Sequence, residues 1–421
     1  MAGSSTSSGI RIFRQHELTN QETGGSTATA AETDAAVRGS EVLLTGNHFA
    51  AFSIDAGRTF QPISPAVFFT GSDGPAFCCD QAVEFAPSHD LMVWILQSEL
   101  KGGSNVLRVA VSQGPDIRAK VWMVYDVTPR LVAPGVEGEY LDSSNIAVSQ
   151  RFLYVTTNLV SGAGDQKELR RQVVLRWPLD KLARYEGFSF DTFTDEPLSP
   201  LRAVQGAGDV MYWGATLADS TLRLYSWPES ADTVRYADVE VEPWESRFAR
   251  FPAPDGRNWL GDVDTSVTAG WLASGVLGFA WTAGADARRP LPHVRIAQID
   301  AGTSRLVAEP HLWSDQLAYA YPAVAPSSRG EVAISVSFGG GQIAPSHAVG
   351  RLKPGGQDVL PRWILHTTRR GEQGPADGSW GDSVSICPHP KEPGTWVATG
   401  YTLQDGGEGE NAEILYVHFG I

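Results

Sequence analysis

The sequence predicts an all-β protein: a single β-propeller of seven four-stranded blades, with an N-terminal strand completing the last blade. Three observations predict this fold: the composition, a repeating strand pattern and the lack of long amphipathic helices. The 421 residues include 44 Gly, 26 Pro and 13 Trp with 19% charged residues, which is typical of many short strands and turns. The best helical candidate, residues 177–185, contains Pro178 and is better interpreted as a strand end followed by one helical turn.

A three-strand pattern repeats along the chain from residue 34. Each unit has an apolar strand, a second strand rich in aromatic residues, a glycine-rich insertion and a third strand. The second strands align at residues 41–47, 91–97, 152–158, 209–215, 276–282, 331–337 and 395–401. Their first residues are roughly 50 to 70 positions apart, longer than the ~40 to 50 of common propeller repeats, and the long insertions account for the excess.

Seven units follow from this alignment, and the propeller is expected to span residues 10–421 after a flexible segment, 1–9. The expected blades cover residues 34–65, 78–128, 139–195, 198–244, 260–316, 318–370 and 379–421. The last unit has three strands, so the unclaimed strand Ile10 to Leu18 is expected to complete it and close the ring without an exposed sheet edge. A β-sandwich or a parallel β-helix is the alternative, which the regular long spacing disfavours.

Arginines recur inside the apolar third strands. They are Arg108, Arg176, Arg223, Arg295 and Arg351. Third strands lie away from the propeller axis, so we expect ion pairs between blades or snorkelling side chains, with contact to an anionic ligand as the alternative.

Residues 53–60 read Ser-Ile-Asp-Ala-Gly-Arg-Thr-Phe. Gly57 permits a positive φ, Asp55 can accept backbone hydrogen bonds, and Phe60 can fold back as an apolar plug. The segment resembles the Asp-box (BNR repeat) of sialidase-like β-propellers, S-x-D-x-G-x-T-[W/F], which joins the outer two strands of a blade; an ordinary hairpin turn is the alternative. The resemblance is at the level of the fold. The sialidase arginine triad and Tyr–Glu pair cannot be assigned, so sialidase activity is disfavoured.

The Asp-box sets the orientation of the blades, because the binding site of a propeller normally lies on the opposite face. Carboxylates near the starts of first strands should meet there, around the axis. The candidate catalytic residues at these positions are Asp80, Asp142, Asp262, Asp382 and Tyr321, and Asp264 is a candidate metal ligand. Such a ring can bind Ca²⁺ or supply an acid and a base for a glycosidic bond. Alternatively, the aspartates cap the strand starts. His347 is a further catalytic candidate because it lies, like His48 and His293, at the start of a third strand.

The loops between second and third strands are long and glycine-rich, and such loops concentrate binding residues. Their cations should form a basic rim around an acidic floor, which suits a sugar carrying a carboxylate. The candidate substrate-binding residues are Gln81, Arg170, Arg289, His293 and Trp380.

Charge and cysteine content exclude some classes of partner. A net charge of −15 argues against nucleic acid, and no apolar run approaches the roughly 20 residues of a membrane helix. Cys78, Cys79 and Cys387 fit no zinc pattern and are expected to be reduced and buried, with a metal or redox role as the alternative. The sequence shows no signal-peptide pattern; because a mature secreted protein would look the same, a secreted or periplasmic monomer is the expectation.

These observations lead to two hypotheses of different classes. The first is a carbohydrate-active enzyme, a glycoside hydrolase or polysaccharide lyase, acting on an acidic glycan at a central axial pocket, with Ca²⁺ as the one cofactor considered. The alternative is a non-catalytic propeller that binds glycans or proteins. A lectin usually repeats its pocket in every blade, whereas these insertions differ in length and chemistry.

Overall fold

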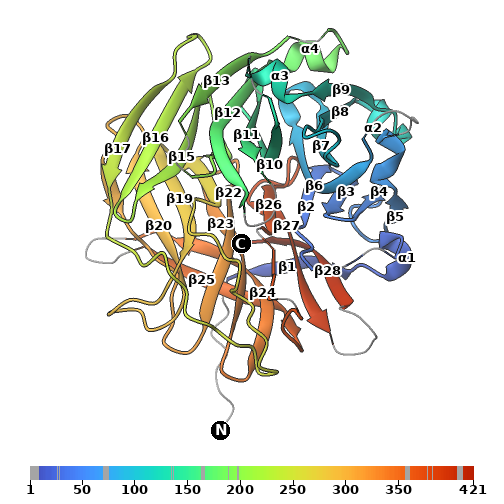
Figure 1. Cartoon of the computed structure of the whole chain (residues 1–421). Helices are drawn as coiled ribbons and strands as arrows, with labels where there is room; N and C mark the ends of the chain where they lie inside the picture. The colour runs from blue at the N-terminus through green and yellow to red at the C-terminus, as the bar shows by residue number, and fades with distance from the viewer. Residues whose placement is uncertain are drawn as a thin grey trace.

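The computed structural model shows a seven-bladed β-propeller (Figure 1). It describes residues 9–25, 27, 29–69, 75–133, 135, 137–162, 166–187, 189–196, 199–355, 361–376, 378–381, 383–404 and 411–421. Each blade is an antiparallel sheet of four strands, and the sheets form a ring. The predicted fold class is therefore confirmed.

Six blades are formed by consecutive strands, numbered from the innermost to the outermost. The first is β2 (Asp34–Arg38), β3 (Glu41–Gly46), β4 (Phe49–Ser53) and β5 (Gln61–Ile63), and the second is β6 (Phe77–Ala86), β7 (Leu91–Ser98), β8 (Leu107–Gln113) and β9 (Met123–Val127). The third is β10 (Glu139–Val148), β11 (Phe152–Ser161), β12 (Glu168–Pro178) and β13 (Asp191–Asp195), and the fourth is β14 (Arg202–Ala203), β15 (Val210–Ala218), β16 (Thr221–Pro228) and β17 (Arg235–Glu240). The fifth is β18 (Ala269–Ala273), β19 (Val276–Ala283), β20 (His293–Asp300) and β21 (Leu306–Ala308), and the sixth is β22 (Ala318–Pro326), β23 (Val332–Gly340), β24 (Ile343–Lys353) and β25 (Arg362–Gly371).

The seventh blade joins the two ends of the chain. It consists of β26 (Ser385–Pro388), β27 (Thr395–Gln404), β28 (Asn411–Gly420) and, outermost, β1 (Arg11–Glu17), which pairs antiparallel with β28. The predicted closure by the N-terminal strand is confirmed. The helices are short and connect strands: α1 (Asn20–Thr23), η1 (Pro65–Phe69), η2 (Pro87–His89), α2 (Pro115–Ala119), α3 (Pro129–Val132) and α4 (Leu179–Ala183).

The Asp-box-like turn joins β4 to β5, the outer strands of the first blade, as the resemblance implies. The Asp55 carboxylate accepts hydrogen bonds from the backbone N–H groups of Arg58 and Thr59, both at 3.0 Å, and Gly57 has φ +75°. Arg14 of β1 donates to the Ala56 carbonyl, and a side chain at Gly57 would collide with Tyr416 of β28. The turn therefore packs against the seam that closes the ring.

The hydrophobic core lies between neighbouring blades rather than inside any one of them. Leu43 and Phe52 of the first blade, for example, share one cluster with Trp94 and Leu96 of the second. Burial of these faces removes large apolar areas from water and holds the blades together. The largest fully buried side chains include nine tryptophans: Trp94, Trp177, Trp213, Trp227, Trp259, Trp271, Trp281, Trp380 and Trp396.

Three of the third-strand arginines form their shortest ion pair within their own blade, whereas the expected pairing between blades occurs at Arg176 and Arg295. Arg108 lies directly opposite Asp126 of β9 in the strand register, with Nε to Oδ1 at 2.6 Å. Arg176 pairs in the same way with Asp191 of β13, and Arg223 with Asp238 of β17. Two of these four also reach another blade. Arg176 contacts the Ala231 carbonyl at 2.9 Å and Asp232 at 3.6 Å in the fourth blade, and Arg295 contacts Glu242 after β17. The neutralised guanidinium groups have a structural role.

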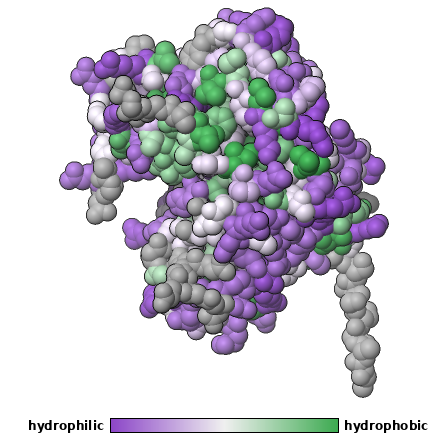
Figure 2. Space-filling view, turned by 90° about the vertical axis from the view of Figure 1, so that its right-hand side faces the viewer, coloured by the Kyte–Doolittle hydropathy of each residue, from purple (hydrophilic) through white to green (hydrophobic). Residues whose placement is uncertain are grey.

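Figure 2 shows the side of the molecule on the right of Figure 1, where hydrophilic residues cover most of the surface and apolar residues form smaller areas between them. The described helices include none that is long and apolar enough to cross a membrane.

Candidate functional site

A cavity of about 220 Å³ lies on the propeller axis and is lined by the inner strand of every blade, from β2 round to β26. Asp80 and Glu84 of β6, Tyr321 of β22, Cys387 of β26 and Asp264, which precedes β18, line it. Because seven strands converge there, residues far apart in the sequence share one small volume.

Two inner strands bulge where they line this cavity. In β10 and β22, three steps along the inner strand oppose two steps along its neighbour, so each strand contains one extra residue. The bulges contain Ser143, with φ +52°, and Tyr321, with φ +55°; both are non-glycine residues in the left-handed region, and both line the cavity. Bulges and such backbone conformations occur often at functional sites because they redirect side chains.

A third bulge, in β6, contains a disulfide bond between Cys78 and Cys79. This corrects the expectation that all three cysteines are reduced; Cys387 is free. Both bonded cysteines are partly exposed, and the next residue along the chain, Asp80, lines the cavity.

Two carboxyl groups, Asp34 and Glu84, form the electrostatic centre of the cavity. Burial raises the pKa of Asp34, although the backbone N–H groups of Val83 and Ala35 donate to its carboxylate at 2.9 and 2.8 Å. Burial and the negative charge of Asp34 raise the pKa of Glu84 to about 8. Glu84 therefore holds a proton at neutral pH, beside a second carboxyl that receives hydrogen bonds suited to its ionised form.

The other charged groups that line the cavity are mostly acidic. Arg202 of β14 lines the cavity and its charge acts on Asp34. Burial raises the pKa of the Cys387 thiol, and the charges of Glu84 and Asp34 add to this, so the thiol keeps its proton. The described lining contains five acidic residues and one arginine: Glu32, Asp34, Asp80, Glu84, Asp264 and Arg202.

Four of the predicted site residues line the cavity: Asp80, Gln81, Asp264 and Tyr321. The Gln81 side chain is held in place, since its Nε2 donates to the carbonyls of Gly46 and Phe49 and its Oε1 accepts from Trp94. Asp264 caps the start of its strand by accepting from the Ser266 N–H at 2.9 Å.

Asp142 is buried beside the cavity but is not part of its lining, and its carboxylate pairs with Lys167 at 2.5 Å. Asp262 is exposed and does not line the cavity. Trp380 is buried, stacks on Tyr401 and donates to Ser337 at 3.2 Å. Asp382 lies outside the described residues.

The predicted third-strand histidines lie between packed elements and away from the cavity. His347 is fully buried, with Nε2 2.8 Å from Ser335 Oγ and Nδ1 2.6 Å from Thr368 Oγ1, and burial lowers its pKa to about 3. His293 is also fully buried, and burial lowers its pKa to about 4. Neither lines the axial cavity.

The expected basic rim is neutralised by ion pairs within the protein. Arg170 pairs with Glu168 at 2.9 Å. Arg289 is buried and contacts Glu242 at 2.7 Å and Asp286 at 2.6 Å. These guanidinium groups are committed to partners and do not line the cavity.

Two groups of described residues bring three metal-ligating atoms within 4.8 Å of one another, and neither includes Asp264. In the group of Glu242, Glu309 and His311, the carboxylates already face arginines: Arg289 lies 2.7 Å from Glu242 and Arg295 lies 3.6 Å from Glu309. Bound guanidinium groups take the place that a metal cation would need.

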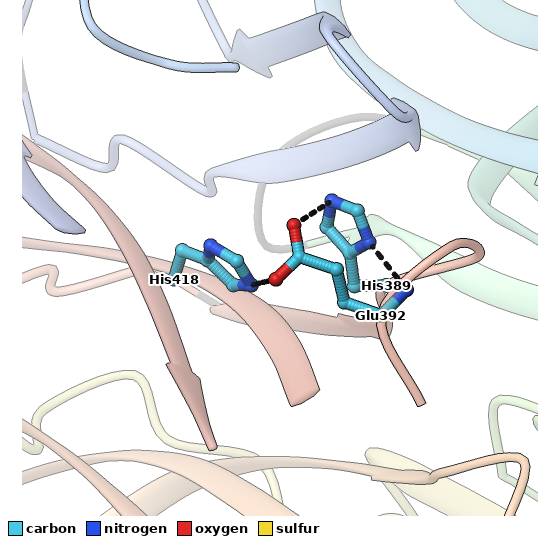
Figure 3. A group of neighbouring side chains, drawn as sticks. All are labelled: His389, Glu392 and His418. Carbon is cyan, nitrogen blue, oxygen red and sulfur yellow. Dashed lines mark hydrogen bonds and ion pairs between the residues drawn. The ribbon is translucent and has the colours of Figure 1, made fainter. Parts of the chain in front are cut away.

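The other group, His389, Glu392 and His418, is shown in Figure 3. Nδ1 of His389 accepts from the backbone N–H of Glu392 at 3.1 Å, so the proton of the neutral ring is on Nε2. His418 Nε2 lies 3.1 Å from the Thr395 hydroxyl, which gives its own proton to the Glu392 carbonyl, so this Nε2 is also protonated. The Nε2 atoms of His389 and His418 lie 3.8 and 3.7 Å from the Glu392 carboxylate. Because each of these nitrogens carries a hydrogen, it has no lone pair to offer a metal ion.

The comparisons with known proteins leave the family of this chain undecided, because no protein-family model and no curated protein matches it. Among solved structures, it is similar to the α-L-arabinanase of Penicillium chrysogenum complexed with arabinobiose, at 8% identity and a TM-score of 0.47, over 96% of this chain and 97% of that chain. It is also similar to a Dyadobacter fermentans protein of unknown function, at 11% identity and a TM-score of 0.45, over 98% of this chain and 99% of that chain. The similarity to the phage phi92 endosialidase has 9% identity and a TM-score of 0.44, over 97% of this chain and 69% of that chain. Similarities at this level carry no information on the reaction of this chain.

Sequence reasoning missed Asp34, Glu84 and Arg202. A signal existed for Glu84, which is a charged residue inside the apolar segment Ala82-Val-Glu-Phe-Ala86 of a first strand. Asp34 occupies the start of the first strand of its unit, the position that drew attention to Asp80 in the next unit.

Proposed function

We propose that this protein is a glycoside hydrolase whose active site is the axial cavity. Glu84 donates a proton to the oxygen of the departing sugar, and Asp34 acts as the second carboxylate, as base or nucleophile. Asp80 and Tyr321 contact the substrate at the surface of the cavity. The observation that carries the proposal is the pair of carboxyls formed by partly buried Asp34 and buried Glu84, of which Glu84 has a pKa of about 8.

Hydrolysis of a glycosidic bond needs two carboxyl groups in different protonation states. Burial and the charge of Asp34 raise the pKa of Glu84 to about 8, so Glu84 keeps a proton near neutral pH, and the two apparent pKa values belong to the pair. Glu84 holds the proton because Asp34 accepts two backbone hydrogen bonds, from Ala35 and Val83, whereas Glu84 accepts one, from Phe85 at 3.0 Å.

The rest of the lining suits a sugar. Ser143, Ser144, Asn145 and Ser385 line the cavity, and hydroxyl and amide groups can both donate to and accept from sugar hydroxyls. These groups come from two inner strands, β10 and β26, so they face a ligand on the axis from different directions.

The charge of the cavity favours an uncharged or amino-sugar glycan over the acidic glycan expected from the sequence. Among the described residues, five acidic side chains and one arginine line it, and the neighbouring Lys167 is paired with Asp142. A uronate would be repelled by this lining. Hydrolysis is favoured over elimination for the same reason, since a lyase must neutralise the carboxylate of its substrate.

The test is hydrolysis of a panel of neutral, amino-sugar and uronic-acid polysaccharides by the wild type, Glu84→Gln and Asp34→Asn. We expect new reducing ends from a neutral or amino-sugar polymer, without the ultraviolet absorbance of an unsaturated product, and a loss of about 100-fold or more in each variant. Equal rates in wild type and Glu84→Gln would exclude the assigned roles. Sugar binding by both proteins without turnover in either would show a binding propeller instead.

A further inference from the structure

The bulge of β6 is larger than the bulges of β10 and β22. Phe77 of β6 pairs with Ser98 of β7, and Gln81 pairs with Leu96. Gln81 is four residues after Phe77, but Leu96 is only two residues from Ser98, so β6 contains two extra residues. The bulges of β10 and β22 contain one extra residue each and a residue with positive φ, whereas no residue of this segment of β6 has a positive φ. Its distinguishing feature is the disulfide bond between the adjacent residues Cys78 and Cys79.

Both ends of the bulge are anchored, and the disulfide lies between the anchors. On one side, the Ala76 carbonyl accepts from the Glu99 N–H at 2.9 Å. On the other side, Gln81 contacts the first blade through the carbonyls of Gly46 and Phe49, and contacts Trp94 of its own blade at 2.9 Å. Between these points the inner strand is out of register with β7, and the ring formed by the two cysteines restricts the backbone covalently.

The bulge presents Asp80 to the cavity. Asp80 follows Cys79 directly, lines the cavity and acts electrostatically on Lys167 of the third blade. Lys167 in turn pairs with Asp142 at 2.5 Å. A change in the backbone at residues 78 and 79 would therefore move a charged group at the cavity and change its distance to Lys167.

We propose that the Cys78–Cys79 disulfide is a positioning element that holds Asp80 in its substrate-binding place, so that binding of the glycan depends on the oxidised bond. This inference rests on the proposed function for its kinetic consequence. A dithiol reductant supplies two electrons and two protons: the S–S bond breaks, two thiols form, and the reductant becomes a cyclic disulfide. The bulge then has more conformations, and Asp80 is less often in place. Glu84 lies four residues further along β6, beyond the anchor at Gln81, and keeps its position.

The first experiment counts thiols by alkylation and mass spectrometry in denaturant. We expect one alkylated cysteine, Cys387, before reduction and three after reduction. Three alkylated cysteines in protein purified without reductant would overturn the proposal, and this result does not depend on any activity.

The second experiment compares kcat and KM of the folded wild type before and after dithiothreitol treatment, with two variants, Cys78→Ala/Cys79→Ala and Cys387→Ala. We expect reduction to raise KM about 5- to 10-fold in wild type and in Cys387→Ala, with kcat within about twofold, because a contact that contributes equally to substrate and transition state is lost. The double variant should have the raised KM before treatment and no response to dithiothreitol. An unchanged KM in reduced wild type, or a response abolished by Cys387→Ala, would overturn it.

Hydrogen exchange separates this proposal from the proposed function. Reduction should speed amide exchange at residues 77–80 at least threefold while leaving residues 142–145 of the β10 bulge unchanged. Unchanged exchange at residues 77–80 would contradict the positioning role. Faster exchange in a protein that hydrolyses no glycan would support the positioning role of the disulfide and refute hydrolysis.

Discussion

Carboxyl groups in two regions of this propeller have pKa values that are shifted in opposite directions. Beside the fifth blade, burial raises the pKa of Glu242, but Arg289 outweighs burial through a hydrogen bond and its charge, and the pKa is lowered. The same arginine and two backbone N–H groups overcome burial to lower the pKa of Asp286 to about 2. On the axis, Asp34 and Glu84 are also buried, but burial dominates there and raises the pKa of both groups.

The difference shows that carboxyl groups can stabilise the fold in one region and hold a transferable proton in another. A partly buried carboxylate that faces an arginine is held as a charge, and Arg289, which bridges Asp286 and Glu242, joins two chain segments. A buried carboxyl next to another carboxyl keeps a proton that can be transferred. Seven inner strands bring such groups together without placing a guanidinium between each pair, so an acid–base pair and an ion-pair network can be built from the same residue types.

Replacement of Glu84 by Gln should have the largest effect. Between pH 4.5 and pH 8 the folded state keeps a proton on Glu84 that the unfolded state has lost, so this group lowers stability as the pH rises through that window. We expect Glu84→Gln to lose glycan hydrolysis by about 100- to 10,000-fold and to be more stable than wild type at pH 8 by roughly 2 to 4 kcal/mol. Rates and urea unfolding at pH 5 and pH 8 measure both. Asp264→Asn, in the same lining, is the control and should change the rate less than about tenfold.

The ion-pair network should respond in stability and not in activity. Arg288 and Arg289 are adjacent and both contact Glu242, but 79% of the Arg288 side chain is exposed against 8% for Arg289. Arg289→Met removes the buried cation that contacts both Asp286 and Glu242, and should cost about 3 to 5 kcal/mol in urea unfolding. Arg288→Met is the matched control and should cost less than about 1 kcal/mol. Equal losses in the two variants would refute this description of the network.

Buried histidines should make the protein sensitive to acid. Burial lowers the pKa of His293 to about 4, and burial with the charge of His389 lowers that of His418 to about 4. The unfolded chain binds these protons at higher pH than the folded chain, so stability should fall as the pH drops from 6.5 to 4. His418→Gln should remove roughly 2 kcal/mol of this loss in unfolding experiments at pH 4 and pH 7, whereas replacement of the exposed His48 should leave the pH dependence unchanged.

A carboxylate satisfied by the backbone should have the smallest effect of the four. Burial raises the pKa of Asp55, but hydrogen bonds from Thr59, Ser53 and Arg58 lower it to about 2. Its contribution to stability is therefore present above pH 3.8 and lost as the pH falls through about 2. Asp55→Ala should cost about 1 kcal/mol at pH 7, with KM and kcat unchanged. A change in KM would contradict this expectation, because it would show that the turn affects substrate binding in the cavity.

The sequence predicted the ring and its closure because both depend on local patterns. The aromatic second strands can be counted along the chain, and a last unit with three strands needs a partner such as Ile10 to Leu18. The same reasoning placed Asp80 and Tyr321 at the axis because both lie near the starts of inner strands.

The remaining site residues depend on contacts between blades, which no local pattern contains. Glu84 looks like an isolated polar residue in an apolar strand until β2 brings Asp34 beside it. His347 was expected at the site because it begins a third strand, but the close approach of Gly400 and the hydroxyls of Ser335 and Thr368 hold it inside the protein. The cysteines were expected to be reduced because no local pattern reveals the two-residue bulge that contains the Cys78–Cys79 bond.

The central claim is that Glu84 carries a proton at neutral pH, and infrared difference spectroscopy tests it without any substrate. The difference between wild type and Glu84→Gln, recorded with ¹³C-labelled glutamate from pH 4 to pH 10, isolates the carboxyl stretch of this one residue. We expect a protonated carboxyl band that persists through pH 7 and disappears with a midpoint near pH 8. A band that disappears near pH 4.5 would contradict the assignment of Glu84 as the proton donor.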